Sequence, residues 1–176
     1  ERSKSVTIRV PQLKDCKQHY DKASGKGLDT EIFITEGQSA AGSLVSCRDA
    51  MRQAIFTLKG KPLNVCNLNR EALYKNVELY NLMCALQIED NTDNVRYNKV
   101  VLATDADVDG LHIRNLMITM FLRFFEGLVR NGHLYILETP LFRVRNKKKT
   151  IYCYSEAERD AAVKDIGRGT EITRFK

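Results

Sequence analysis

Short β-branched runs alternate along this chain with longer segments of helical spacing. A strand is predicted over residues 30–35, followed by a turn at residues 36–39 and a segment from residue 40 whose first part has helical spacing. Ser39 is a suitable N-cap for that helix. The same order recurs over residues 99–130 as a strand, an acidic turn and a long helix with an apolar pattern.

The remaining segments extend this pattern. Residues 71–86 have helical spacing, and a further strand is predicted over residues 133–138, before Pro140. Two strand-like runs then flank a basic tip and precede a short helix and a last strand, at residues 141–145, 150–154, 156–166 and 171–175. Strands that alternate with helices predict an α/β fold with a mostly parallel sheet flanked by helices. The C-terminal hairpin predicts a small α+β annex.

The pattern predicts three parts. Residues 1–29 are polar, contain a Ser-Gly-Lys-Gly stretch and are expected to form a flexible arm or linker. Residues 30–145 would form the main domain, and residues 146–176 the C-terminal annex. Because the chain starts at Glu1 instead of methionine and ends without a terminating feature, we expect a piece truncated from a longer protein.

Composition narrows the class of protein. A chain of 176 residues with 43% hydrophobic content can bury a full core, and no apolar run reaches the length of about 18 residues that crosses a membrane. Five dispersed cysteines suggest reduced thiols in a cytoplasmic protein, not a disulfide frame or a zinc site, and three histidines show no metal-ligand spacing. The net charge of +6 is compatible with a nucleic-acid or phosphate partner.

The acidic turn Asp105-Ala106-Asp107-Val108-Asp109-Gly110 is the most informative segment. Its three carboxylates occupy alternate positions, point to one side of an extended backbone and repel one another unless a cation lies among them. Oxygen ligands suit a hard cation such as Mg²⁺. Glu36 follows the first predicted strand as Asp105 follows the later one. Because sites in open parallel sheets form beyond the carboxyl ends of the strands, neighbouring strands would bring Glu36 to the three aspartates.

Other interpretations of these acids remain open. D-x-D-x-D-G also opens the helix–loop–helix calcium loop, but its twelfth position, which supplies a Glu ligand, is Leu116 here. A solvated acidic turn without an ion is a second alternative. Glu36 could likewise be only a surface acid, and Gly42 only a packing glycine.

These motifs resemble the TOPRIM module of the B subunit of bacterial type IIA DNA topoisomerases. The resemblance rests on Glu36-Gly37-x-Ser39-Ala40, on the acidic turn with His112-Ile113-Arg114, and on further segments at residues 53–54, 58–64, 132–135 and 139–142. It runs from about Leu13 to the end of the chain. Residues 61–63, 143–149 and 152–155 are more similar to the B subunit of topoisomerase IV than to that of gyrase. Gln38 and Ala41 depart from the gyrase pattern E-G-D-S-A-G-G, so any role of that Asp is not carried over.

The resemblance implies a Rossmann-like TOPRIM fold and an ATP-hydrolysing type II DNA topoisomerase, an isomerase that passes one duplex through a transient break in another. The nucleophilic tyrosine would belong to the A subunit of an A2B2 heterotetramer, and ATP would bind only in an N-terminal domain outside this chain. The enzyme would be cytoplasmic and associated with the nucleoid, and the isolated fragment inactive. The B subunit of DNA gyrase, a TOPRIM primase or nuclease, and a non-catalytic docking module are the alternatives.

The same resemblance assigns site residues. Glu36, Asp105 and Asp107 are expected to hold Mg²⁺ for DNA cleavage, with Asp109 completing the metal cluster directly or through water, and Mn²⁺ or Ca²⁺ as substitutes. Four basic side chains are expected to contact double-stranded DNA: Lys59, Lys61, His112 and Arg114. Ordinary solvated lysines and a capping or packing histidine are the alternatives for this second set.

Overall fold

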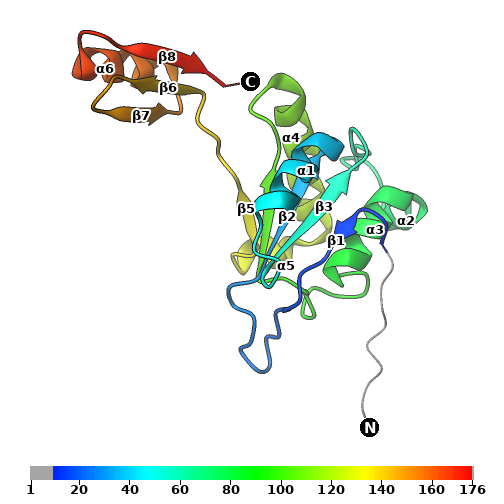
Figure 1. Cartoon of the computed structure of the whole chain (residues 1–176). Coiled ribbons are helices and arrows are strands. Elements are labelled where there is room, and N and C mark those ends of the chain that lie inside the picture. The colour runs from blue at the N-terminus through cyan, green and yellow to red at the C-terminus, as the bar shows by residue number, and fades with distance from the viewer. Residues whose placement is uncertain (1–9, 176) are drawn as a thin grey trace.

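The main part of the protein is a five-stranded sheet, which a computed structural model describes together with the rest of residues 10–175 (Figure 1). The strand order is β1-β3-β2-β4-β5. Four strands are parallel: β2 (Glu31–Glu36), β3 (Gln53–Leu58), β4 (Lys99–Ala103) and β5 (Leu134–Ile136). The short β1 (Leu13–Lys14) pairs antiparallel with β3 at one edge. The predicted α/β fold with a mostly parallel sheet is therefore confirmed.

Five helices accompany this sheet: α1 (Gly37–Cys47), α2 (Arg70–Lys75), α3 (Val77–Leu86), α4 (Val108–Phe124) and α5 (Glu126–Arg130). Two helices that the sequence predicts as continuous are each divided. Asn76 ends α2 and starts α3, because its side chain accepts a hydrogen bond from the N–H of Leu79. Phe125 separates α4 from α5. Within the part of the chain that the structure describes, no helix has the length and apolar character needed to cross a membrane.

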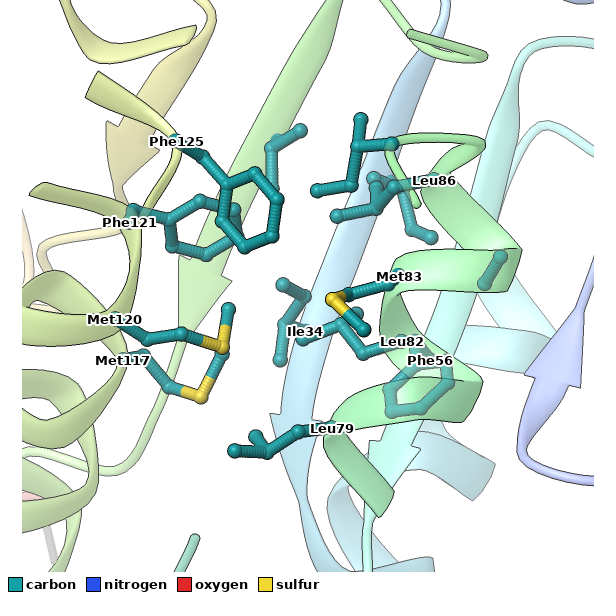
Figure 2. Close-up of a cluster of buried hydrophobic side chains, with 14 of the residues drawn as sticks. Ile34, Phe56, Leu79, Leu82, Met83, Leu86, Met117, Met120, Phe121 and Phe125 are labelled. Atoms are coloured by element: carbon teal, nitrogen blue, oxygen red, sulfur yellow. The ribbon is translucent and has the colours of Figure 1, made fainter. Parts of the chain in front are cut away.

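The core lies between one face of the sheet and helices α3, α4 and α5 (Figure 2). Ile34 of β2 is fully buried at its centre, with Met83 of α3 on one side and Met117 and Met120 of α4 on the other. Helix α1 packs on β2 and β3, and Ala41 is its buried residue. Covering both faces explains why the central strands read as continuous apolar runs.

Strand β3 and the start of α1 differ from the sequence prediction. Every residue of β3 after Gln53 is buried, so this strand lacks the alternation that would have identified it next to a helical segment. Glu36, not Ser39, is the N-cap of α1, and Ser39 is an exposed residue of the first turn. The helix therefore starts directly at the end of β2, without the intervening turn that was expected.

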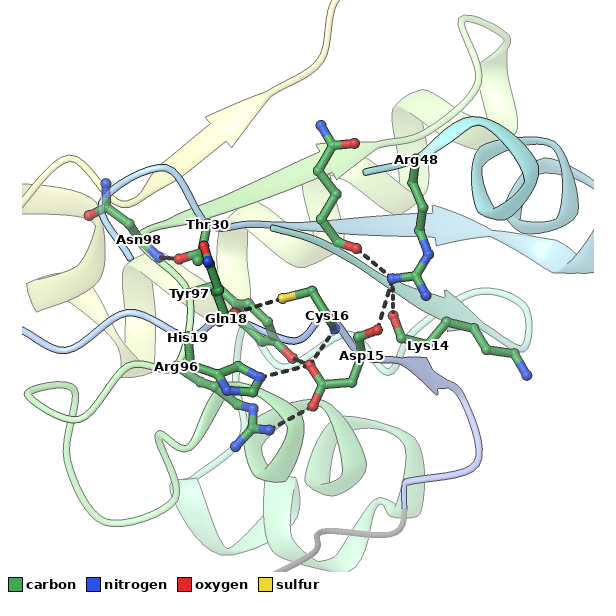
Figure 3. Close-up of polar contacts among 11 residues, drawn as sticks. Lys14, Asp15, Cys16, Gln18, His19, Thr30, Arg48, Arg96, Tyr97 and Asn98 are labelled. Carbon is green, nitrogen blue, oxygen red and sulfur yellow. Dashed lines mark hydrogen bonds and ion pairs between the residues drawn. The ribbon is translucent and has the colours of Figure 1, made fainter. Parts of the chain in front are cut away.

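Residues 10–29, expected to belong to a flexible arm, are attached to the sheet (Figure 3). Asp15 accepts hydrogen bonds of 2.6 Å from the guanidinium of Arg96 and from the hydroxyl of Tyr97. Val10 and Cys16 are buried in the same core as the strands. This segment binds through contacts with residues about 80 positions away, which composition does not reveal. The first nine residues of the expected arm lie outside the described residues.

The C-terminal annex is a separate antiparallel sheet of order β7-β6-β8, covered by α6 (Glu156–Ile166). Its strands are β6 (Phe142–Arg145), β7 (Thr150–Cys153) and β8 (Glu171–Arg174). The predicted hairpin is confirmed, and Figure 1 shows the annex set apart from the five-stranded sheet. Because β6 pairs with β7 and β8, the annex starts before residue 146, in the segment after β5.

Candidate metal centre

Glu36 lies where β2 ends and α1 begins. Gly37 follows it with φ of +71°, a conformation that glycine adopts without strain and that lets the helix start at once. The Glu36 side chain is turned partly inward, and its buried Oε2 has no hydrogen-bond partner. A buried carboxylate oxygen without a partner is costly, so this atom is a candidate ligand for a cation.

The acidic turn follows β4 and runs into α4, which starts at Val108, earlier than the sequence predicts. Asp107 is the N-cap of α4, and its carboxylate accepts a 2.8 Å hydrogen bond from the N–H of Gly110. A Cβ atom at Gly110 would collide with the carbonyl oxygen of Asp105. Glycine therefore allows the first turn of α4 to pack directly on the backbone of Asp105, which fixes the spacing between the two aspartates.

Strand pairing brings these segments to one edge. β2 and β4 are parallel neighbours, with Thr35 opposite Ala103, so Glu36 and Asp105 both leave the sheet at the edge where the parallel strands end. We call this the carboxyl edge, formed by the ends of β2, β3 and β4. The opposite edge, where these strands begin, is the amino edge.

The electrostatics of the carboxyl edge follow from this placement. Burial raises the pKa of Glu36, and the negative charges of Asp105, Asp107 and Asp109 raise it further, while Lys61 opposes them. The structure thus places Glu36 within the field of all three aspartates. These carboxylates do not form a tight cluster. Among residues 10–175, the three ligand atoms found within 4.8 Å of one another belong to a different group, described below.

The residues expected to contact DNA surround this edge in different ways. Lys61 forms an ion pair of 2.7 Å with Asp109, which raises the pKa of Lys61 and lowers that of Asp109. Lys59 is exposed, and its backbone N–H donates to the carboxylate of Glu78. His112 is exposed on the first turns of α4.

Arg114 borders a cleft of about 310 Å³ that starts at Asp105 and Asp107. Its Nε donates a 3.4 Å hydrogen bond to the hydroxyl of Thr104, which turns the guanidinium toward the end of β4. Glu138 and Tyr154 also line this cleft, and the sequence assigned no site role to either. Glu138 could have been noticed, because it follows the strand next to β4 and so approaches the same edge.

A second group of polar residues lies at the amino edge (Figure 3). The ligand atoms of Asp15, Cys16 and His19 lie within 4.8 Å of one another, although the sequence shows no metal-ligand spacing there. Burial opposes ionisation of Asp15, but hydrogen bonds with His19, Tyr97 and Arg96 outweigh it and lower its pKa. The thiol of Cys16 donates to the carbonyl of Gln18, and burial and the charge of Asp15 raise the pKa of this thiol to about 11. Each of these three side chains therefore has a hydrogen-bond partner within the protein.

The oxygen-only donor set and the unpartnered Oε2 of Glu36 fit a hard divalent cation at the carboxyl edge. Glu36, Asp105 and Asp107 form no ion pair with the basic side chains of residues 10–175, whereas Asp109 is paired with Lys61. The three unpaired acids are therefore the candidate ligands, and Asp109 stands apart from them.

Comparison with known proteins identifies relatives of this chain. The chain is 60% identical, over its whole length, to the B subunit of DNA topoisomerase 4 from Borreliella burgdorferi, and it spans 29% of that relative. It is 46% identical over 133 residues to the B subunit of DNA gyrase from Mycoplasmoides gallisepticum, a match that covers 73% of this chain and 20% of the relative.

A solved structure extends the comparison to three dimensions. The Plasmodium falciparum topoisomerase II DNA-binding, cleavage and re-ligation domain superposes with a TM-score of 0.80 at 26% identity, covering all of this chain and 25% of that one. The family model described as Toprim domain matches residues 31–139, from the first residue of β2 past the end of β5. This match includes Glu36 and the whole acidic turn and covers more than half of the chain. The chain therefore belongs to the Toprim family.

Proposed function

We propose that this chain is the metal-binding part of a type IIA DNA topoisomerase B subunit, similar to topoisomerase IV, that supports DNA cleavage in the bacterial cytoplasm. A tyrosine of the A subunit would attack the DNA backbone, and ATP hydrolysis elsewhere in the B subunit would drive strand passage. The observation that carries the proposal is the position of Glu36 beside three aspartates, with a buried oxygen that lacks a partner. The identity of 60% to a topoisomerase 4 subunit favours this enzyme over gyrase.

Glu36, Asp105 and Asp107 would hold Mg²⁺ in this proposal. When bound there, the ion would stabilise the charge that develops on the leaving oxygen of the scissile phosphodiester. The chain itself fixes two of these acids: the capping bond to Gly110 orients Asp107, and the close packing of Gly110 holds the backbone of Asp105. A cation would also favour the charged form of Glu36, because burial and the negative charges of the three aspartates raise its pKa.

The test uses the full-length B subunit reconstituted with its A subunit on plasmid DNA, with and without Mg²⁺. Asp105→Ala should reduce Mg²⁺-dependent cleavage by about a hundredfold or more. The matched control is Asp93→Ala, which removes an exposed aspartate on a loop away from the acidic turn and should leave cleavage unchanged. Undiminished cleavage by the Asp105 variant would refute the role. DNA hydrolysis or primer synthesis by the B subunit alone would instead support a nuclease or primase.

A further inference from the structure

Lys61 forms an ion pair with Asp109 at the carboxyl edge. Its Nζ lies 2.7 Å from Oδ1 of Asp109, and among residues 10–175 no other basic side chain pairs with any of the four carboxylates. The contact joins the loop after β3 to the first turn of α4. It therefore crosses the edge on which the candidate ligands lie.

The loop that carries Lys61 is fixed at two points. It leaves β3 at Leu58, which is the strand partner of Glu36, so the loop starts beside the candidate metal ligands. The N–H of Lys59 donates to Glu78 of α3, and the ammonium of Lys61 reaches Asp109 of α4. Lys61 is thus held near Glu36 by the structure around it, not only by its own flexible stem.

The pair remains accessible to a ligand. The side chains of Lys61 and Asp109 are 51% and 65% exposed, so the ammonium still faces solvent while one carboxylate holds it. An ammonium has three donors, and Asp109 occupies only part of this capacity. A phosphodiester that approaches four carboxylates meets repulsion, which a positive group fixed at the same edge would offset.

Resting on the proposed function, we propose that Asp109 is a positioning residue that holds Lys61 toward a phosphate of bound DNA, and is not a metal ligand like Asp105 and Asp107. The ion pair separates Asp109 from the two unpaired aspartates of the same turn. Lys61 then contributes a defined phosphate contact. Lys59 on the same loop, tied only through its backbone, contributes general attraction.

The first measurement is DNA affinity without metal, in EDTA, for the full-length B subunit with its A subunit. Lys61→Met should weaken binding about tenfold and reduce the slope of log affinity against log salt by about one. Asp109→Asn should weaken binding about threefold when residue 61 is lysine and have no effect in the Lys61→Met background, because neighbours that act together are not additive. Asp109→Glu keeps the carboxylate and should therefore bind DNA as the wild type does.

The matched control is Lys59→Met on the same loop. It should weaken DNA binding by a similar or smaller factor, and its effect should add to that of Asp109→Asn, since the Lys59 side chain is not tied to Asp109. Non-additivity with Lys61 together with additivity with Lys59 supports the proposal. Equal additivity of both lysines with Asp109→Asn overturns it.

The second measurement is direct Mn²⁺ binding without DNA, followed by electron paramagnetic resonance. Asp109→Asn should change the Mn²⁺ affinity less than about threefold, whereas Asp107→Asn should weaken it more than about tenfold. Equal weakening by both variants would make Asp109 a ligand and overturn the proposal. A wild-type complex that fails to cleave DNA with Mg²⁺ would instead contradict the proposed function and leave these two binding results intact.

Discussion

Asp15 at the amino edge and Glu36 at the carboxyl edge are both partly buried acids of the same sheet, yet their surroundings differ. Asp15 accepts hydrogen bonds from Arg96 and Tyr97 and lies 3.0 Å from His19, which together lower its pKa. Glu36 has an unpartnered oxygen and three acidic neighbours, and its pKa is raised. The amino edge uses an acid to hold the fold together. At the carboxyl edge, one carboxylate oxygen of Glu36 has no hydrogen-bond donor among the described residues.

The difference teaches that proximity alone does not identify a metal site. Asp15, Cys16 and His19 bring their ligand atoms closer together than the acids of the carboxyl edge do. Each of them already has a partner in the protein, and the raised pKa of the Cys16 thiol disfavours the thiolate that binds metal. Unsatisfied charge, more than short distance, marks the functional edge.

The largest effect that separates the two acids is expected from Glu36→Gln. This variant should reduce Mg²⁺-dependent cleavage by about a hundredfold or more, while the free energy of unfolding stays equal or rises by less than about 1 kcal/mol, because repulsion among the acids is relieved. Cleavage assays of the reconstituted enzyme and urea unfolding measure the two quantities. Glu31→Gln, at the other end of β2, is the matched control and should retain cleavage. A loss of stability in the Glu36 variant would place Glu36 with Asp15 as a structural acid.

The opposite result is expected for Asp15→Asn. It should lower the free energy of unfolding at pH 7 by about 2 kcal/mol, because the charged acceptor of Arg96 and Tyr97 is lost, and should leave metal binding unchanged. Since the pKa of Asp15 is lowered by folding, its stabilisation is present above the unfolded value near 3.8 and is lost as the pH falls through the folded value. Urea unfolding should therefore show wild type and variant converging below about pH 4. A gap that widens toward low pH would contradict the assignment.

The last test of the amino edge concerns the thiols. Cys16 is buried with its pKa raised to about 11, so it should react with a disulfide reagent at pH 8 at least about a hundredfold more slowly than the exposed Cys47 and Cys66. Timed labelling followed by mass spectrometry of peptides measures each site. Addition of Co²⁺ is the companion test and should produce no thiolate charge-transfer absorption. Such absorption, lost in Cys16→Ser, would make the amino edge a metal site.

The sequence was sufficient for the parts of the site that depend on local order. Glu36 and Asp105 each follow a strand, and the rule for parallel sheets places both at one edge, as the pairing of β2 with β4 shows. The hairpin of the annex was also readable from two runs around a polar tip. The bounds of α6 agree with the predicted helix, where Ser155 provides the cap.

Contacts between distant segments could not be read in the same way. The bond between Tyr97 and Asp15 joins residues 82 positions apart, and no local pattern distinguishes it from two unrelated polar side chains. The ion pair between Lys61 and Asp109 could not be predicted either, because nothing in the sequence shows that a loop lysine has a partner within the protein as well as a DNA contact. Strand β3 was not predicted, because burial on both of its faces removes the alternation of apolar and polar residues.

The two-residue β1 has a practical consequence for anyone who shortens this chain. It covers the outer backbone of β3, a six-residue segment, Gln-Ala-Ile-Phe-Thr-Leu, that carries no charge. A version that starts at residue 30 would leave those N–H and C=O groups open, and an uncharged apolar border of this kind readily recruits strands from other molecules. Recombinant work on the isolated domain should therefore retain residues 10–29 to keep the material monodisperse.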